Sequence, residues 1–318
     1  MTNLNTLGYD HIDIATSYNS LGNVYQRKGE YDSAIEYHKK SLKIKLSKLV
    51  HDHIDVASSY NNLGNVYEKK GEYDKAIEYH EKALKIRLNK LESDHIDVAS
   101  SYNNLGITYG NKGEYDKAIK CHEKSLKIKL NKLGSDHIDV ANSYNDLGVV
   151  YEYNGEYDNA IEYHEKSLKI FLDKMGSNHF YVAHPYNNLG FVYGKKGKCD
   201  KAIEYCNKSL KIRLDKLGSD HIDVAASYKN LALVYYGKQE CDKAMEFGRK
   251  ALDLRLKRLD SNHPDVGNSY DILGDINCKK GEKMDANKCY ENAISIYTQK
   301  FGENHQKTQE VMLKLKNL

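Results

Sequence analysis

Apolar residues recur along the chain with the period of an α-helix, in segments that come in pairs. Val56, Tyr60, Leu63 and Tyr67 are spaced by four, three and four residues, which places them on one face of a helix. Gly71 follows this segment and suits the left-handed residue that often ends a helix. A second apolar stripe then extends over residues 73–91. The pattern predicts two consecutive helices and leaves no place for strands.

This pair of helices repeats with a fixed period. Histidine recurs every 42 residues, and the units that begin at residues 53 and 95 differ at only nine positions. Such a period is typical of solenoid proteins, in which each unit buries its apolar side against its neighbours. We therefore predict a single array over residues 1–318. It consists of a partial helix at 1–10, seven repeats at 11–52, 53–94, 95–136, 137–178, 179–220, 221–262 and 263–304, and a C-terminal capping helix at 305–318.

The two ends of the array differ in their expected packing. Residues 4–11 match residues 130–137, so the chain begins partway through a second helix, and copies could associate through this open end. At the other end, one side of the last helix is apolar and should cover the seventh repeat, through Val311, Met312 and Leu315. The opposite side should face water, through Lys307, Glu310, Lys314 and Lys316.

Composition narrows the class of partner. The net charge is +3, which gives no reason to expect nucleic acid or a membrane surface as the partner. The start of the chain is polar and does not resemble a secretory signal. The six cysteines show no framework of paired spacings, which favours a reducing compartment. We therefore expect a cytoplasmic protein.

Two histidine series could indicate a metal or catalytic site. One series opens each unit, and its members should sit at helix starts, where a polar side chain can bind open backbone N–H groups. The other lies on the inward stripe of the second helix, at His38, His80, His122 and His164. Ligands of one metal must converge from several directions, whereas these histidines occur once per unit along the array. We expect structural roles, and predict no metal, no cofactor, no catalytic residue and no enzymatic activity.

The spacing Tyr60-x2-Leu63-Gly64-x2-Tyr67, followed by Ala76, resembles the tetratricopeptide repeat signature. The 42-residue form, which opens with His-Ile-Asp-Val-Ala, closely resembles the repeats of kinesin light chains. The resemblance implies an all-α fold, a right-handed superhelical solenoid of antiparallel helix pairs. It also implies that the first helix of each pair lines a concave groove that binds proteins or peptides, in extended or short helical segments.

By this resemblance, the groove contains an asparagine ladder and an apolar stripe. The asparagines could pair with a peptide backbone or, alternatively, with each other within the array; they are Asn61, Asn62, Asn103, Asn104, Asn145, Asn187, Asn188 and Asn230. The stripe could anchor a partner or reflect drift after duplication; it comprises Ile107, Val149, Phe191 and Leu233, flanked by Tyr153 and Lys195. His184 and Lys229 complete the expected groove, and a basic clamp for a terminal carboxylate is not predicted because only Lys229 fits it.

The fifth repeat departs most from the others. Pro185 falls inside its first helix and cannot donate a backbone hydrogen bond to Tyr181, which predicts a kink or a late helix start. The change lies near Phe191, which is therefore the expected binding hot spot.

The sequence predicts a protein-interaction scaffold similar to the cargo-binding repeats of kinesin light chains. The alternatives are a self-assembling structural array and an accessory domain of a larger signalling or motor-associated protein.

Overall fold

The computed structural model describes residues 11–318, which form α-helices, one 3-10 helix and short connections, with no strand in this range. The predicted all-α class is confirmed. The partial helix predicted at 1–10 lies outside the described residues. The chain divides into two compact units between Glu156 and Tyr157, within the fourth repeat, and the prediction of a single array stays a prediction.

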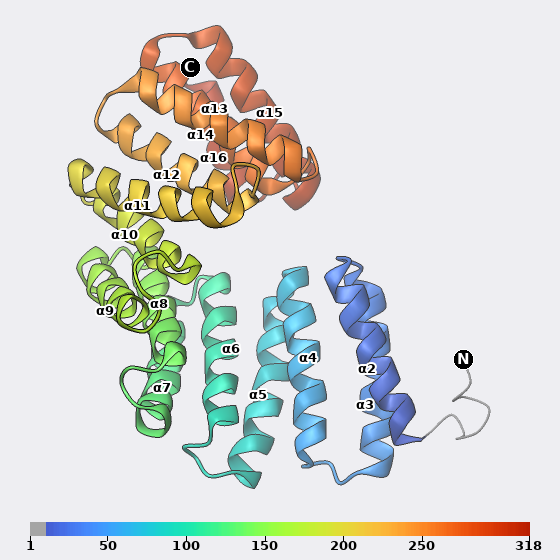
Figure 1. Cartoon of the computed structure of the whole chain (residues 1–318). Coiled ribbons are helices and arrows are strands. Elements are labelled where there is room, and N and C mark those ends of the chain that lie inside the picture. The colour runs from blue at the N-terminus through green and yellow to red at the C-terminus, as the bar shows by residue number, and fades with distance from the viewer. Residues whose placement is uncertain (1–10) are drawn as a thin grey trace. The chain divides into compact units, whose positions relative to one another are not determined.

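The first unit is a row of antiparallel helices that lie side by side (Figure 1). Each first helix pairs with the helix that follows it, and each second helix also packs against the next first helix. The helices are α2 (Ile12–Arg27), α3 (Tyr31–Lys48), α4 (Ile54–Lys70), α5 (Tyr73–Lys90), α6 (Ile96–Lys112), α7 (Tyr115–Leu133) and α8 (Ile138–Tyr153).

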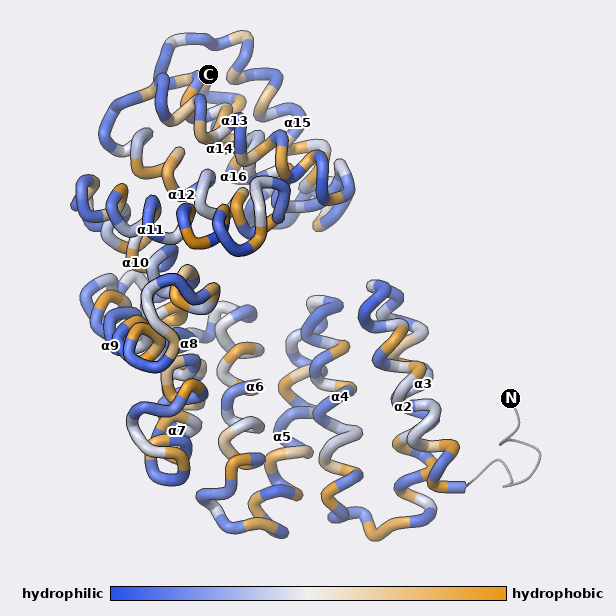
Figure 2. The backbone as a smooth tube through the Cα atoms, viewed as in Figure 1, coloured by the Kyte–Doolittle hydropathy of each residue, from blue (hydrophilic) through white to orange (hydrophobic). Residues whose placement is uncertain are grey.

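The second unit has the same packing and adds a terminal helix. Its helices are α9 (Tyr157–Met175), the 3-10 helix η1 (Phe180–Val182), α10 (Ala183–Lys195), α11 (Cys199–Leu217), α12 (Ile222–Gly237), α13 (Cys241–Arg258), α14 (Pro264–Lys280), α15 (Lys283–Phe301) and α16 (Gln306–Lys316). Hydrophobic and hydrophilic positions alternate along these helices in both units, as expected for amphipathic helices packed in pairs (Figure 2).

The histidines that open the repeats cap their helices, as the sequence predicts. In α4, the Nδ1 atom of His53 accepts a hydrogen bond of 3.1 Å from the backbone N–H of Asp55. The ring thereby takes the place of the Ser or Asp side chain that usually caps a helix. At the other end, Gly71 adopts the left-handed conformation with φ of 83°, which only glycine adopts without strain.

The two helices of a repeat approach most closely where a glycine of the first faces a large side chain of the second. A Cβ atom built on Gly64 would lie 2.5 Å from Cε1 of His80, and the His80 ring is completely buried. The sixth repeat shows the complementary exchange, because Ala232 replaces the glycine and Gly248 replaces the histidine. The inward histidines are therefore packing residues, matched in size to the glycine opposite.

The first helix of the fifth repeat starts late, as Pro185 predicts. The chain forms η1 where the other repeats begin their α-helix, and α10 begins only at Ala183. Pro185 is then the third residue of α10. The first N–H groups of a helix have no partner within it, so the missing donor of proline costs no helical hydrogen bond there.

The terminal helix α16 covers the last repeat, with Val311 buried and Leu315 packed against the core of the second unit. The expectation that Lys314 faces water is wrong. Its ammonium group lies 2.7 Å from a carboxylate oxygen of Asp271 and 2.9 Å from one of Asp275. Both acidic residues belong to α14, and helical periodicity alone does not identify such a partner on a neighbouring helix.

We predict that Gly64→Ala lowers the free energy of unfolding by about 1–3 kcal/mol, because the added methyl group overlaps the His80 ring. Adding His80→Gly recreates the pair found in the sixth repeat and should recover part of the loss. Urea unfolding of the wild type, both single variants and the double variant measures this coupling. Simply additive losses would show that the two positions do not constrain each other.

The buried histidines should make the fold sensitive to acid. Burial lowers the pKa of His38, His80 and His122 to about 4, and that of His164 to about 3. Between pH 6.5 and pH 4 the unfolded chain therefore binds more protons than the folded chain, and stability falls as the pH decreases.

We predict that His80→Cys removes the proton that His80 binds in the unfolded chain but not in the folded chain. The substitution introduces the side chain of the equivalent Cys206. The slope of unfolding free energy against pH between 6 and 4.5 should become shallower by up to about 1.4 kcal/mol per pH unit. Urea titrations at several pH values, with a thiol reductant present, measure the slope. An unchanged slope would mean that His80 already carries a proton in the folded protein or is accessible to one.

Candidate functional site

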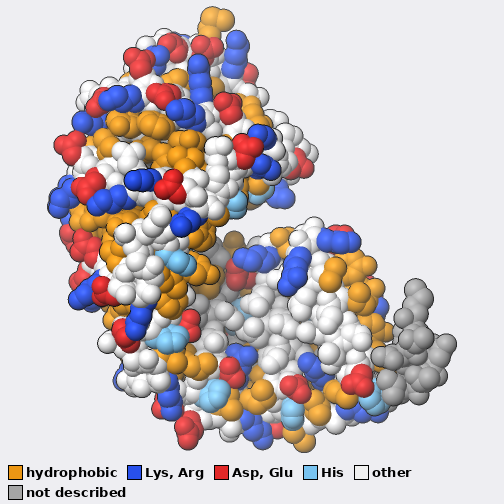
Figure 3. Space-filling view, viewed as in Figure 1, with side chains coloured by type: hydrophobic (Ala, Val, Ile, Leu, Met, Phe, Trp, Pro, Cys, Tyr) orange, Lys and Arg blue, Asp and Glu red, His pale blue; other side chains and the backbone are white. Residues whose placement is uncertain are grey.

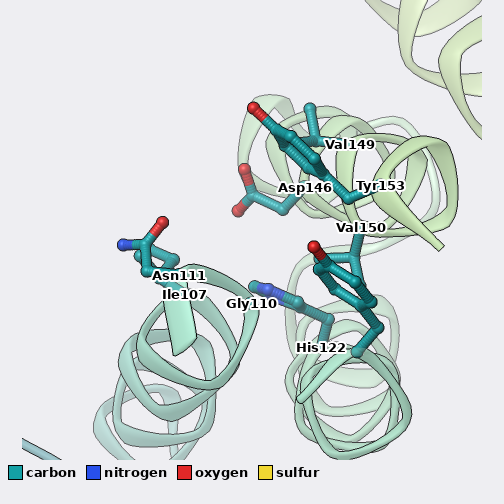
Figure 4. Close-up of a pocket in the computed structure, with 9 residues that line it drawn as sticks. Ile107, Gly110, Asn111, His122, Asp146, Val149, Val150 and Tyr153 are labelled. Carbon is teal, nitrogen blue, oxygen red and sulfur yellow. The ribbon is translucent and has the colours of Figure 1, made fainter. Parts of the chain in front are cut away.

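The first unit has a pocket between the first helices α6 and α8, which we call the α6–α8 pocket (Figure 4). Its cavity measures about 300 Å³, and three predicted groove residues, Ile107, Val149 and Tyr153, line it. Tyr153 is 66% exposed, and its ring stacks on Tyr115 of α7 with centroids 6.3 Å apart. The walls are therefore apolar and aromatic, and they are open to solvent.

Two polar residues outside the predicted groove also line this pocket. They are His122 of α7, for which the sequence predicts a structural role, and Asp146 of α8. Asn103 links them. Its Oδ1 atom is 3.1 Å from Nδ1 of His122, and its side chain also hydrogen-bonds to Asp146. Because a carbonyl oxygen only accepts, Nδ1 of His122 carries the proton, and the amide group of Asn103 donates to the carboxylate.

Burial shifts the pKa values of both His122 and Asp146. Loss of hydration lowers the pKa of His122 to about 4 and raises the pKa of Asp146 to about 6, with the charge of Lys129 and the hydrogen bond from Asn103 opposing the rise. At neutral pH the imidazole is therefore uncharged and the carboxylate is mostly ionised. The α6–α8 pocket consequently presents one negative charge between apolar walls.

Lys129 belongs to a contact that recurs along the chain. Its Nζ atom donates to the hydroxyl of Ser143 at 2.7 Å. Cations at the equivalent position bind the equivalent serine in other repeats, as in Arg87 to Ser101, also at 2.7 Å. This contact joins the second helices α3, α5, α7, α11 and α13 to the first helix that follows each of them. It explains why a charged residue interrupts the apolar stripe of these second helices.

The second unit has a similar pocket, the α10–α12 pocket, with a cavity of about 260 Å³. Four predicted groove residues line it, namely Phe191, Lys195, Asn230 and Leu233. Tyr236 and Asp275 also line it and were not predicted.

Two lysines flank the half-buried ring of Phe191 in this pocket. The Nζ atoms of Lys195 and Lys229 lie 5.3 and 5.7 Å from the ring centroid, within the range of cation–π interactions. His184, on the same helix, is half-buried, packs edge-on against Phe180, and has its pKa lowered by burial. The α10–α12 pocket therefore combines an aromatic anchor with two lysines, and its carboxylate, Asp275, is already paired with Lys314 at 2.9 Å.

Several asparagines of the predicted ladder bind each other across neighbouring first helices. Nδ2 of Asn62 donates to Oδ1 of Asn19 at 2.8 Å, and Nδ2 of Asn104 donates to Oδ1 of Asn61 at 2.7 Å. This is the pairing within the array that the sequence left open as an alternative.

The ladder continues differently in the second unit, where Nδ2 of Asn230 donates to the backbone oxygen of Asn187 at 3.3 Å. Asn145 and Asn188 are half-buried. The asparagine ladder is thus used at least partly for packing, and its contact with a peptide stays a prediction.

Among residues 11–318, no group of three or more histidine, cysteine, aspartate or glutamate side chains is placed to hold a metal ion. No described helix is both long enough and apolar enough to cross a membrane. Lysine, arginine and acidic side chains are interspersed over the face seen in Figure 3, without a large area of one sign.

Comparison with known proteins agrees with this geometry. The TPR-like repeats of a kinesin-light-chain-type protein from Podosopora anserina have a TM-score of 0.56 and 24% identity, covering 66% of this chain and 98% of that chain. BtubC (BKLC) from P. vanneervenii has a TM-score of 0.56 and 22% identity, covering 77% and 91%. The apo form of RapI has a TM-score of 0.71 and 21% identity, covering 94% and 99%. At these identities the likeness concerns the fold alone.

The sequence itself matches a known family over most of its length. A separate search for similar individual proteins among curated ones returned no match. The profile of the tetratricopeptide repeat matches residues 4–47, 55–131, 97–173 and 181–257. With the Leu-Gly-x2-Tyr spacing and the helix pairs that this spacing builds, the match shows that the chain belongs to the tetratricopeptide repeat family.

Proposed function

We propose that this chain is a protein-interaction scaffold that binds short polypeptide segments on the faces formed by its first helices. Tetratricopeptide repeats generally mediate contacts between proteins. The observation that carries the proposal for this chain is the placement of the apolar stripe. Its side chains line open pockets in the third to sixth repeats, and the outer repeats have polar residues at the same position.

The stripe position is polar in the first two repeats and in the last, at Asn23, Asn65 and Asp275. Those repeats form the same helix pairs, so an apolar side chain there is not needed for folding. In the third to sixth repeats the position is apolar, and its side chains line the α6–α8 and α10–α12 pockets. Apolar surface kept in an open pocket is a common anchor for a partner, which favours binding over drift after duplication.

This proposal gives the polar residues a secondary role. Lys195, Lys229 and the asparagines would fix the register of a bound segment, as the kinesin light chain resemblance suggests for a groove of this type. No catalytic step is proposed. A cytoplasmic location, expected from the cysteine pattern, stays a prediction.

We predict that Phe191→Asp weakens peptide binding to the second unit by about thirtyfold or more, since a central aromatic anchor contributes about 2 kcal/mol or more. Met284→Asp is the matched control, because Met284 is an exposed apolar residue of α15 outside both pockets. Peptides selected from a random library on the wild type, measured by fluorescence anisotropy, provide the comparison.

Asn145→Ala, tested with the same peptides, reports on the asparagine ladder. A smaller loss than for Phe191→Asp is expected, since the asparagines fix register rather than anchor the segment. If the selected peptides bind wild type, Phe191→Asp and Asn145→Ala equally well, the proposed binding face is wrong.

A second candidate is self-assembly through the α2 side of the first unit. Leu21 and Val24 are 41% and 48% exposed, whereas the equivalent Leu63 and Val66 in α4 are fully buried. Figure 3 shows hydrophobic side chains over this end of the unit. Two copies could cover these surfaces mutually, in an isologous dimer. The open end expected at Leu4–Leu7 lies outside the described residues.

We predict that, if this assembly occurs, the mass measured by light scattering rises with protein concentration, and that Leu21→Asp with Val24→Asp keeps the chain monomeric. Leu256→Asp, which changes an exposed leucine of α13, is the control. A constant monomeric mass up to about 100 μM would exclude association tighter than about 5.5 kcal/mol at this surface. That result would not contradict the proposed peptide binding.

A further inference from the structure

We propose that the α6–α8 pocket binds one lysine or arginine side chain of the partner segment, with Asp146 as the charge partner and Tyr153 as an aromatic wall. The inference rests on the proposed function, because it names the kind of side chain that this part of the binding face accepts. Its basis is the presence of a single carboxylate where the fold does not require one.

The position of Asp146 is occupied by asparagine in other repeats, at Asn62, Asn104, Asn188 and Asn230. Asn104 shows that the amide is sufficient for packing, because it binds the asparagine of the preceding first helix at 2.7 Å. In the fourth repeat the same two positions are in contact with the direction reversed, because the carboxylate of Asp146 accepts a hydrogen bond from the side chain of Asn103. The carboxylate thus keeps the packing contact and adds a negative charge.

The charge faces the cavity. In Figure 4 the carboxylate of Asp146 points into the space between α6 and α8, and the side chains of Ile107 and Asn111 lie on the opposite side of that space. Burial makes the ionised form costly, as the pKa of about 6 shows. Lys129 offsets part of this cost, but its ammonium group is held by Ser143 in the recurring contact between helices. A cation that enters the cavity would offset more of it.

The walls suit the rest of a long basic side chain. Ile107 and Val149 offer apolar surface for its methylene groups, and the Tyr153 ring, stacked on Tyr115, offers an aromatic face for its charged end. The neighbouring His122 is neutral at physiological pH and does not repel a cation. Together these groups favour a cationic side chain over an acidic one.

The α10–α12 pocket provides an internal contrast. Its aromatic residue, Phe191, already has Lys195 and Lys229 over the ring, so the positions that a ligand cation would take are occupied by the protein's own lysines. A partner cation is therefore expected at the α6–α8 pocket and not at Phe191. The two pockets therefore differ in the kind of side chain that each would accept.

The decisive variant is Asp146→Asn, which restores the side chain found in the neighbouring repeats and should leave the fold intact. Asp116→Asn is the matched control, since it removes one exposed carboxylate from α7 outside the pocket. Random decapeptides would be selected on the wild-type chain. Each selected peptide that contains lysine or arginine would then be compared with an analogue that carries norleucine at that position. Affinities would be measured on all three proteins, with thermal melting as the check on folding.

We expect selected peptides to be enriched in lysine or arginine, and norleucine replacement to weaken binding at least fivefold on wild type and on Asp116→Asn. On Asp146→Asn the same replacement should change affinity by less than twofold. Peptides without such enrichment, or an equal loss on all three proteins, would overturn the inference while leaving the proposed peptide binding intact. If no peptide is selected at all, the proposed function and the inference both fail.

Discussion

Most repeats depend on a close contact between their two helices, made by a glycine of the first helix and a side chain of the second, and the sixth repeat has Ala232 and Gly248 at these positions. At Gly64 the gap is so small that a single Cβ atom would collide with His80. The fifth and seventh repeats keep the glycine and place Cys206 and Tyr290 against it. This contact fixes how far apart the helices lie, and so it determines which of their side chains remain available to other molecules.

The contacts between repeats have a comparable regularity and use a different chemistry. In five of the repeats a lysine or arginine late in the second helix reaches the serine of the next first helix, as Arg255 reaches Ser269 at 2.6 Å. The asparagine pairs add a second polar contact between neighbouring first helices. Because these groups are committed to packing, the positions free to vary are those on the open face of the first helices. There the stripe and Asp146 depart from the repeat, and we assign function to these departures.

Periodicity was sufficient to predict the fold. The 42-residue repeat, the glycine at the end of α4 and the displaced start of α10 at Pro185 follow from local sequence, because each reflects backbone geometry within one helix or turn. The helix-capping role of histidines such as His53 is local in the same sense.

The site was only partly predictable, because its polar contacts join different helices. The sequence identified Ile107, Val149 and Phe191 by their departure from the repeat. Asp146 also departs from the repeat. Its role in the pocket follows only from the structure, which shows that its carboxylate is buried and linked to His122 through Asn103. Lys314 was misjudged for a related reason, since its partners lie on α14 and its helical position alone suggested exposure.

The most direct test of the account is to map where a bound segment touches the chain. A peptide selected on the wild type would carry a photoreactive benzophenone side chain, and the attachment sites would be identified by mass spectrometry. The account predicts attachment to the first helices, in α6 and α8 of the first unit and in α10 and α12 of the second. Attachment mainly to the second helices α5, α7, α11 and α13 would contradict it.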